Sequence, residues 1–172
     1  MPHTLRRSLL LLGGPPGAGK TTVLRILTET VPGCVAIDAD DVWSPATFAQ
    51  REQDGRIGIA KVADAVQSHF DSGGQRVVLA WVFARAEMFI PFLDQFVGLV
   101  DELCQLYLVA SPDVLKGRLT ARGDLEKVPY AWSRLDLIRR LPFKSIDTSI
   151  LAPSLVAAEI THEMQWTDSI GA

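Results

Sequence analysis

The chain has 172 residues, 48% of them hydrophobic and 22% charged, and a formal net charge of −3. These values fit one folded domain over residues 1–172 and exclude a disordered protein. They also exclude the broad basic footprint of nucleic-acid binding, and no apolar stretch is long enough to cross a membrane. We expect a cytoplasmic protein, a monomer or homodimer, with neither nucleic acid nor membrane as a partner. Cys34 and Cys104 lie in apolar runs, as buried reduced thiols do.

Short apolar runs alternate with helical patterns along the chain. Continuous apolar runs predict parallel strands buried on both faces, and apolar residues three or four apart predict helices. The expected strands span residues 8–12, 34–37, 77–83, 103–109 and 143–146. Two expected helices begin at Lys20 and at Pro112. The others span residues 58–70, 86–97, 130–141 and 153–164. This alternation predicts a doubly wound α/β sheet that binds ligands at the carboxyl ends of its strands.

A phosphate loop lies between the first expected strand and helix. Residues 14–21 read GPPGAGKT and fit the pattern G-x-x-x-x-G-K-[ST]. Its glycines let the backbone curl so that successive N–H groups face phosphate oxygens. Lys20 reaches the β- and γ-phosphates, and the Thr21 hydroxyl is placed to bind Mg²⁺. The residues expected to bind a nucleotide are Gly14, Pro15, Pro16, Gly17, Ala18, Gly19, Lys20, Thr21 and Thr22.

Three acidic residues, Asp38, Asp40 and Asp41, follow the second expected strand. At that edge of the sheet a carboxylate either supports Mg²⁺ or accepts the proton of an attacking hydroxyl. Alternation along an extended segment places Asp38 and Asp40 on one side, so this pair is the functional prediction. Asp41 is predicted to be a helix N-cap. Solvated turn residues are the alternative for all three.

Positive charge gathers after the fourth expected strand, at Lys116, Arg118 and Arg122. Arg118 and Arg122 are four residues apart and therefore share a helix face. Phosphoryl transfer needs positive charge over the transferred group, which a basic lid at about residues 118–134 would supply while excluding water. A solvated basic face is the alternative, and it is the expectation for Arg139 and Arg140.

The segment from about residue 41 to 72 is expected to cover the acceptor. It carries Trp43 and Phe48, and Trp81 and Phe83 belong to the third strand. Aromatic side chains suit a partly apolar small molecule, although Phe48 and Phe83 fit a hydrophobic core equally well. Residues 80–85, at the end of the third strand, include no acidic residue to help hold the metal.

Together these residues resemble the small P-loop phosphotransferases, the group that includes shikimate, gluconate and adenylate kinases. GRLTARGD (117–124) and VAIDAD (35–40) are similar to the lid and second strand of chloramphenicol 3-O-phosphotransferases. WSRLD (132–136), PF (142–143) and IDT (146–148) are similar to the tail of the tunicamycin-resistance ATP-binding proteins. The resemblance implies ATP and Mg²⁺ as cofactors and a P-loop NTPase fold, a five-stranded parallel sheet of order 2-3-1-4-5 flanked by helices.

The resemblance also implies roles for individual residues. Asp40 would accept the proton of the acceptor hydroxyl, and Mg²⁺ would rest on Thr21, Asp38 and the nucleotide. The Asp147-Thr148 turn would lie near the adenine. The basic residues expected around the phosphates are Lys20, Arg118, Arg122 and, further along the lid, Arg134.

The expected activity is transfer of the γ-phosphate of ATP to a hydroxyl of a small molecule, with an antibiotic among the candidate acceptors. A nucleoside or nucleotide kinase is one alternative, although the D-G-[FY]-P-R run of adenylate kinases is absent. A non-catalytic ATP-binding protein with a resistance or regulatory role is the other.

Overall fold

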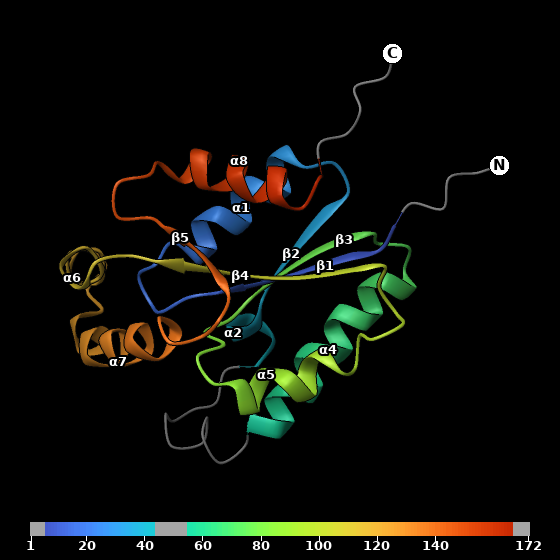
Figure 1. Cartoon of the computed structure of the whole chain (residues 1–172), viewed down its shortest axis with the longest axis horizontal. Helices are drawn as coiled ribbons and strands as arrows, with labels where there is room; N and C mark the ends of the chain where they lie inside the picture. The colour runs from blue at the N-terminus through green and yellow to red at the C-terminus, as the bar shows by residue number, and fades with distance from the viewer. Residues whose placement is uncertain (1–5, 44–54, 167–172) are drawn as a thin grey trace.

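The computed structural model describes residues 6–43 and 55–166. Within them, five parallel strands form one sheet of order β2-β3-β1-β4-β5, as the resemblance implies (Figure 1). The strands are β1 (Ser8–Gly13), β2 (Cys34–Asp38), β3 (Arg76–Ala80), β4 (Glu102–Val109) and β5 (Lys144–Asp147). The helices are α1 (Lys20–Thr30), α2 (Ala39–Val42), α4 (Gly55–Asp71), α5 (Ala86–Leu93), α6 (Pro112–Ala121), the 3₁₀ helix η1 (Leu125–Lys127), α7 (Val128–Ile138) and α8 (Pro153–Glu163).

The register of the strands sets which residues meet at the carboxyl edge of the sheet. Asp38 at the end of β2 is opposite Ala80 at the end of β3, and Gly13 at the end of β1 is opposite Tyr107 of β4. Parallel strands bring their carboxyl ends to one edge, where ligands bind in open α/β sheets. The phosphate loop and the first acidic residue therefore leave the same edge of the sheet, with β3 between their strands.

Each face of the sheet carries its own hydrophobic core because side chains alternate along a strand. Leu10 and Leu12 of β1 pack with α1 and α8, which lie above the sheet in Figure 1. Leu9 and Leu11 pack with α4 and α5, which lie below it. The consecutive leucines of β1 are fully buried, as expected for a central parallel strand.

The structure differs from the predicted elements mainly after β3. The predicted strand extends to Phe83, but β3 ends at Ala80. Phe83 adopts a positive φ of 45°, which an extended strand does not accommodate. The predicted helix over residues 86–97 is also too long, since α5 ends at Leu93, soon after Pro91.

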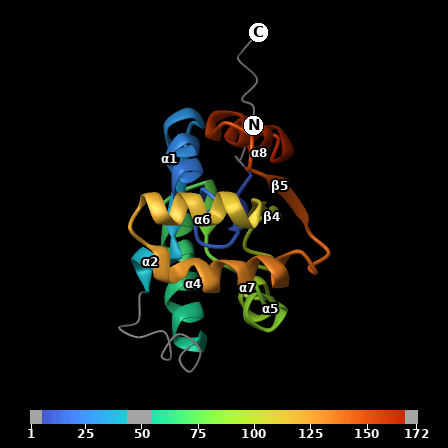
Figure 2. The same cartoon turned by 90° about the vertical axis from the view of Figure 1, so that its left-hand side faces the viewer.

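The segment predicted as a lid is more regular than its composition suggests. Gly123 has a φ of 78° and ends α6, after which η1 and α7 follow directly. Leu119, Val128 and Ala131 form a small core of their own between α6 and α7. Figure 2 shows α6 and α7 crossing the side of the molecule that faces left in Figure 1. Among the described residues, no helix is long and apolar enough to cross a membrane.

The two thiols are free, and burial raises the pKa of both. Cys34 is buried, with a pKa of about 11, and Cys104 is half-buried. Since the thiolate is the reactive form, neither cysteine is primed for chemistry.

Candidate active site

The phosphate loop has the backbone shape that its sequence predicts. Gly14, Gly17 and Gly19 have φ values of 153°, 83° and 99°, a region that favours glycine. Gly19 immediately precedes α1, so the loop leads into a helix N-terminus, where the helix dipole favours anions.

Lys20 folds back over this loop. Its Nζ donates to the carbonyl oxygens of Gly14 at 2.8 Å and of Pro15 at 3.1 Å. Burial lowers the pKa of Lys20 from 10.5 to about 8. The carboxylates of Asp38 and Asp40 act in the opposite direction, and the Arg122 guanidinium lowers the pKa further. Lys20 is therefore a cation kept in a poorly solvated place, a setting in which an anionic ligand is strongly attracted.

Asp38 connects the acidic segment to the phosphate loop. The Thr21 hydroxyl donates to Asp38 Oδ2 at 3.1 Å, and the Asp40 backbone N–H donates to Asp38 Oδ1 at 3.2 Å. Asp38 is thus the N-cap of α2, and the prediction that Asp41 caps this helix is wrong. The predicted extended alternation is also wrong, because α2 begins at Ala39.

The pair of Thr21 and Asp38 fits the predicted metal site. A hydroxyl and a carboxylate oxygen lie next to each other, and Mg²⁺ is typically held by one or two such protein oxygens together with phosphates. Among the described residues, no group of three or more His, Cys, Asp or Glu side chains is arranged to hold a metal ion. Any Mg²⁺ here would therefore depend on the nucleotide for further ligands.

Asp40 differs from Asp38 in its exposure. Both residues act on the pKa of Lys20, so both lie within electrostatic reach of the phosphate loop. Asp38 is half-buried with each carboxylate oxygen engaged, whereas Asp40 is exposed. The two carboxylates thus have different surroundings in the structure, a difference that the sequence alone does not predict.

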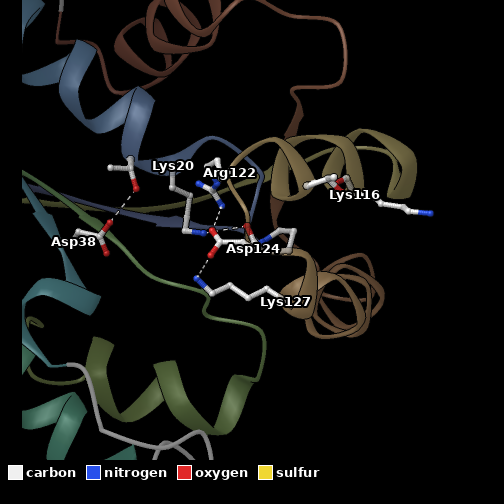
Figure 3. Close-up of polar contacts among 9 residues, drawn as sticks. Lys20, Asp38, Lys116, Arg122, Asp124 and Lys127 are labelled. Atoms are coloured by element: carbon white, nitrogen blue, oxygen red, sulfur yellow. Dashed lines mark hydrogen bonds and ion pairs between the residues drawn. The ribbon is translucent and has the colours of Figure 1, made fainter.

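Arg122 lies at the exit of α6 beside Asp124 and Lys127. Arg122 Nη2 is 3.5 Å from Asp124 Oδ2, and Lys127 Nζ is 2.8 Å from Asp124 Oδ1. The hydrogen bond from Lys127 holds the pKa of Asp124 below its usual value. Figure 3 shows both cations turned toward Asp124, while Lys116 of the same basic run points away. Of the charge run, Arg122 therefore faces the phosphate loop and Lys116 does not.

Arg118 contacts the backbone of the phosphate loop, and its predicted contact with the phosphates stays a prediction. Its guanidinium donates to the Gly17 carbonyl at 3.2 Å, to Thr148 Oγ1 at 3.0 Å and to the Thr148 carbonyl at 2.6 Å. Arg118 thus ties the phosphate loop to the chain that follows β5. No local pattern reveals this contact, because Thr148 is 30 residues further along the chain.

A cavity of about 320 Å³ adjoins this contact. It lies between the start of α1, the end of α6 and the start of α8. Thr148 is among its walls, and the expectation that the Asp147-Thr148 turn borders a nucleotide base stays a prediction. The lining residues are Gly17, Ala18, Gly19, Thr22, Val23, Arg118, Ala121, Arg122, Thr148, Leu151, Pro153 and Val156.

Arg134 lies on α7 with its guanidinium 4.5 Å from the centre of the Tyr130 ring. The predicted phosphate contact of Arg134 stays a prediction. Its stacking on Tyr130 shows that a neighbouring aromatic ring already holds this cation in place. Arg139 and Arg140 are exposed, as predicted.

The aromatic residues near the acidic edge form a connected group. The ring centres of Trp43 and Trp81 are 6.3 Å apart, and those of Trp81 and Phe83 are 5.8 Å apart. Phe83 is buried in the core, while both tryptophans keep some exposed surface. Phe48, predicted near the acceptor, lies outside the described residues.

The geometry defines a nucleotide-binding protein with a P-loop kinase-like fold. The family described as "AAA domain" matches residues 10–131, and the chain therefore belongs to that family. In a human protein, "Threonine synthase-like 1", a segment is 28% identical over 121 residues. That match covers 62% of this chain but only 16% of the human protein.

Two solved structures share the fold across nearly the whole chain. The tunicamycin resistance protein of Deinococcus radiodurans has a TM-score of 0.71 and 20% identity, covering 92% of this chain and 96% of that one. A sugar kinase from Janibacter has a TM-score of 0.67 and 17% identity, covering 97% of this chain and 99% of that one. The predicted resemblance to small P-loop kinases is thereby confirmed, at the level of the fold.

Proposed function

We propose that this protein is an ATP- and Mg²⁺-dependent kinase that transfers the γ-phosphate to a hydroxyl of a small molecule. The observation that carries the proposal is the different surroundings of two carboxylates that lie two residues apart. Asp38 is engaged by Thr21 and by the cap of α2, while Asp40 is exposed beside the same loop. A kinase needs one carboxylate beside the metal and another that can accept the proton of the acceptor hydroxyl.

The roles follow from these surroundings. Thr21 and Asp38 would hold Mg²⁺, which neutralises charge on the phosphates when it is bound. Lys20 and Arg122 direct positive charge at the phosphate loop, and Lys20 leaves its two carbonyl partners to meet a phosphate. Asp40 takes the proton of the acceptor hydroxyl. The cavity bordered by Thr148 would receive the base of the nucleotide.

The acceptor is proposed from chemistry and fold together. The half-buried Trp43 and Trp81 next to the acidic edge offer apolar surface to a small molecule. An antibiotic is one class to test, because the tunicamycin resistance protein of D. radiodurans shares the fold. Sugars are another, because a sugar kinase does so too.

The test is a mass-spectrometric screen of hydroxylated small molecules with Mg-ATP, followed by Asp40→Asn on any acceptor found. Loss of a general base should lower kcat by about 10²–10⁴ while ATP affinity stays within about twofold. Asp41→Asn is the matched control, since Asp41 is also exposed on α2. Equal turnover of Asp40→Asn and wild type would refute the assignment of the base. ATP binding without any phosphorylated product across the screen would favour the ATP-binding module instead.

A further inference from the structure

We propose that Thr148 is a positioning residue that, together with Arg118, fixes the phosphate loop in its anion-binding shape. The inference rests on the proposed nucleotide site. It concerns a residue that follows β5, far along the chain from the loop that it controls. Thr148 is only 4% exposed, although its side chain is polar, so its hydrogen bonds are made inside the protein.

The hydroxyl of Thr148 stands at the centre of a closed set of contacts. Thr148 Oγ1 accepts a hydrogen bond from Arg118 Nη1 at 3.0 Å and donates toward the carbonyl oxygen of Ala18 at 3.0 Å. The carbonyl of Val109, at 3.1 Å, is a second acceptor for the same hydroxyl. Arg118 Nη1 also donates to the Gly17 carbonyl at 3.2 Å. Two consecutive carbonyls of the phosphate loop are therefore held from outside.

The backbone of Thr148 anchors the arrangement to the sheet. Its N–H donates to the Val109 carbonyl at 2.8 Å, and its own carbonyl accepts from Arg118 Nη2 at 2.6 Å. The position of the hydroxyl is thus set by β4 rather than by the loop. Arg118 is fixed at two points by one residue, which uses the forked geometry of the guanidinium.

The carbonyl orientation matters because of the way a phosphate loop works. In a trans peptide unit the C=O and the N–H point in opposite directions. A carbonyl of Ala18 held toward Thr148 therefore directs the N–H of Gly19 the other way, while the N–H of Ala18 donates to the Pro15 carbonyl at 3.2 Å within the loop. The loop binds phosphate through such N–H groups, and a carbonyl turned inward would repel the anion. Glycines at 17 and 19 make these peptide units easy to rotate, so hydrogen bonds from outside the loop are needed to hold their orientation.

The consequence is a preorganised anion site whose shape depends on residues outside the motif. Preorganisation improves affinity by removing the ordering cost at the moment of binding. Because the clamp acts on the backbone, its loss should weaken binding of any polyphosphate, whether or not a base is attached. A residue that only lined the base cavity would affect ATP and leave tripolyphosphate unchanged.

The experiment compares Thr148→Val, which removes the hydroxyl at nearly constant shape, with Thr148→Ser, which restores it. Calorimetry measures the Kd of Mg-ATP and of magnesium tripolyphosphate for each. Thr148→Val should weaken both ligands by on the order of tenfold, as expected for a lost buried hydrogen bond, while Thr148→Ser stays within about threefold of wild type. Thr161→Val is the matched control, because the Thr161 hydroxyl donates to the Ala157 carbonyl within α8, away from the phosphate loop.

Arg118→Lys gives a second test that does not depend on how well the valine variant folds. Lysine keeps the charge but not the fork, so tripolyphosphate binding should still weaken by several-fold. Unchanged tripolyphosphate affinity in Thr148→Val or Arg118→Lys, or equal loss in Thr148→Ser and Thr148→Val, would overturn the inference. If the wild-type chain binds neither ligand, the proposed function falls and the inference falls with it, and the wild-type measurement alone separates that case.

Discussion

Nucleotide affinity should depend on pH through Lys20. Burial sets the pKa of this lysine at about 8 in the free protein, whereas a phosphate beside its Nζ would raise the pKa well above that value. Binding therefore requires a proton to be taken up whenever Lys20 is neutral at the start. The carboxylates of Asp38 and Asp40 favour the charged lysine, but burial is the larger influence.

The size of the effect follows from the titration of one group. About three quarters of the free protein carries a charged Lys20 at pH 7.5, but only about one tenth does so at pH 9. Affinity for Mg-ATP should therefore fall by about eightfold between these two values, and by about tenfold for each further pH unit. The phosphates themselves are ionised by pH 7.5, since their second pKa is about 6.

The assay is calorimetric titration at pH 7.5, 8.25 and 9 in two buffers with different ionisation enthalpies, which also counts the protons taken up. Near pH 8 the uptake should be about half a proton per ATP bound. Lys20→Arg is the control, since arginine stays charged and its weaker binding should be flat over this range. A constant Kd from pH 7.5 to 9 with no proton uptake would show that Lys20 does not change charge on binding, and would refute the reasoning.

Two predictions on stability follow from the same region. The folded pKa of Lys20 lies below its unfolded value of 10.5, so the charged form opposes folding by up to about 3 kcal/mol below pH 8, and this penalty disappears between pH 8 and 10.5. Lys20→Met should therefore raise the free energy of unfolding at pH 7 by about 1–3 kcal/mol in urea titrations, a net value because the two hydrogen bonds from Nζ are also lost. This gain should disappear by pH 11, where Lys20 is neutral in both the folded and the unfolded protein. Gly13→Ala places a Cβ within 3 Å of the buried Tyr107 ring and should destabilise the fold by about 1–3 kcal/mol, while Gly117→Ala on α6, with no atom within 4 Å, should be neutral or stabilising. Equal melting temperatures for the two alanine variants would contradict this account of Gly13.

The sequence predicts what local patterns encode. The loop at residues 14–21, the alternation of strands and helices and the leucines of β1 all depend on neighbours within a few residues, and each is found as predicted. The end of β3 was not predictable in the same way. Val82 and Phe83 are apolar and suit a strand, but Phe83 adopts a left-handed conformation whose carbonyl accepts from the Tyr107 hydroxyl at 2.8 Å. That partner is 24 residues away and on another strand.

The roles of the acidic residues after β2 also depend on a contact between residues far apart in the sequence. Three aspartates within four residues look equivalent in the sequence, and an extended segment would pair Asp38 with Asp40. The bond from Thr21 to Asp38, across 17 residues, makes Asp38 the one that connects to the loop and caps α2. The different surroundings of the carboxylates thus come from the parallel register of β1, β3 and β2, which brings two strand ends together.

Arg118 and Arg122 show most clearly that the role of a basic residue depends on its packing in the fold rather than on its place in a run of charges. They are one turn apart at the end of α6, and the sequence gives them the same predicted role. Arg118 is half-buried and bound by Gly17 and Thr148, so its charge acts on the backbone of the loop. Arg122 is exposed and shares Asp124 with Lys127. An incoming phosphate must compete with Asp124 for Arg122. Arg118, in contrast, is already hydrogen-bonded to Gly17 and Thr148. We therefore expect Arg122, rather than Arg118, to be the cation of the proposed lid that moves to the phosphates. Because salt screens exposed charges, added salt should change the Kd of Mg-ATP far less in Arg122→Ala than in wild type.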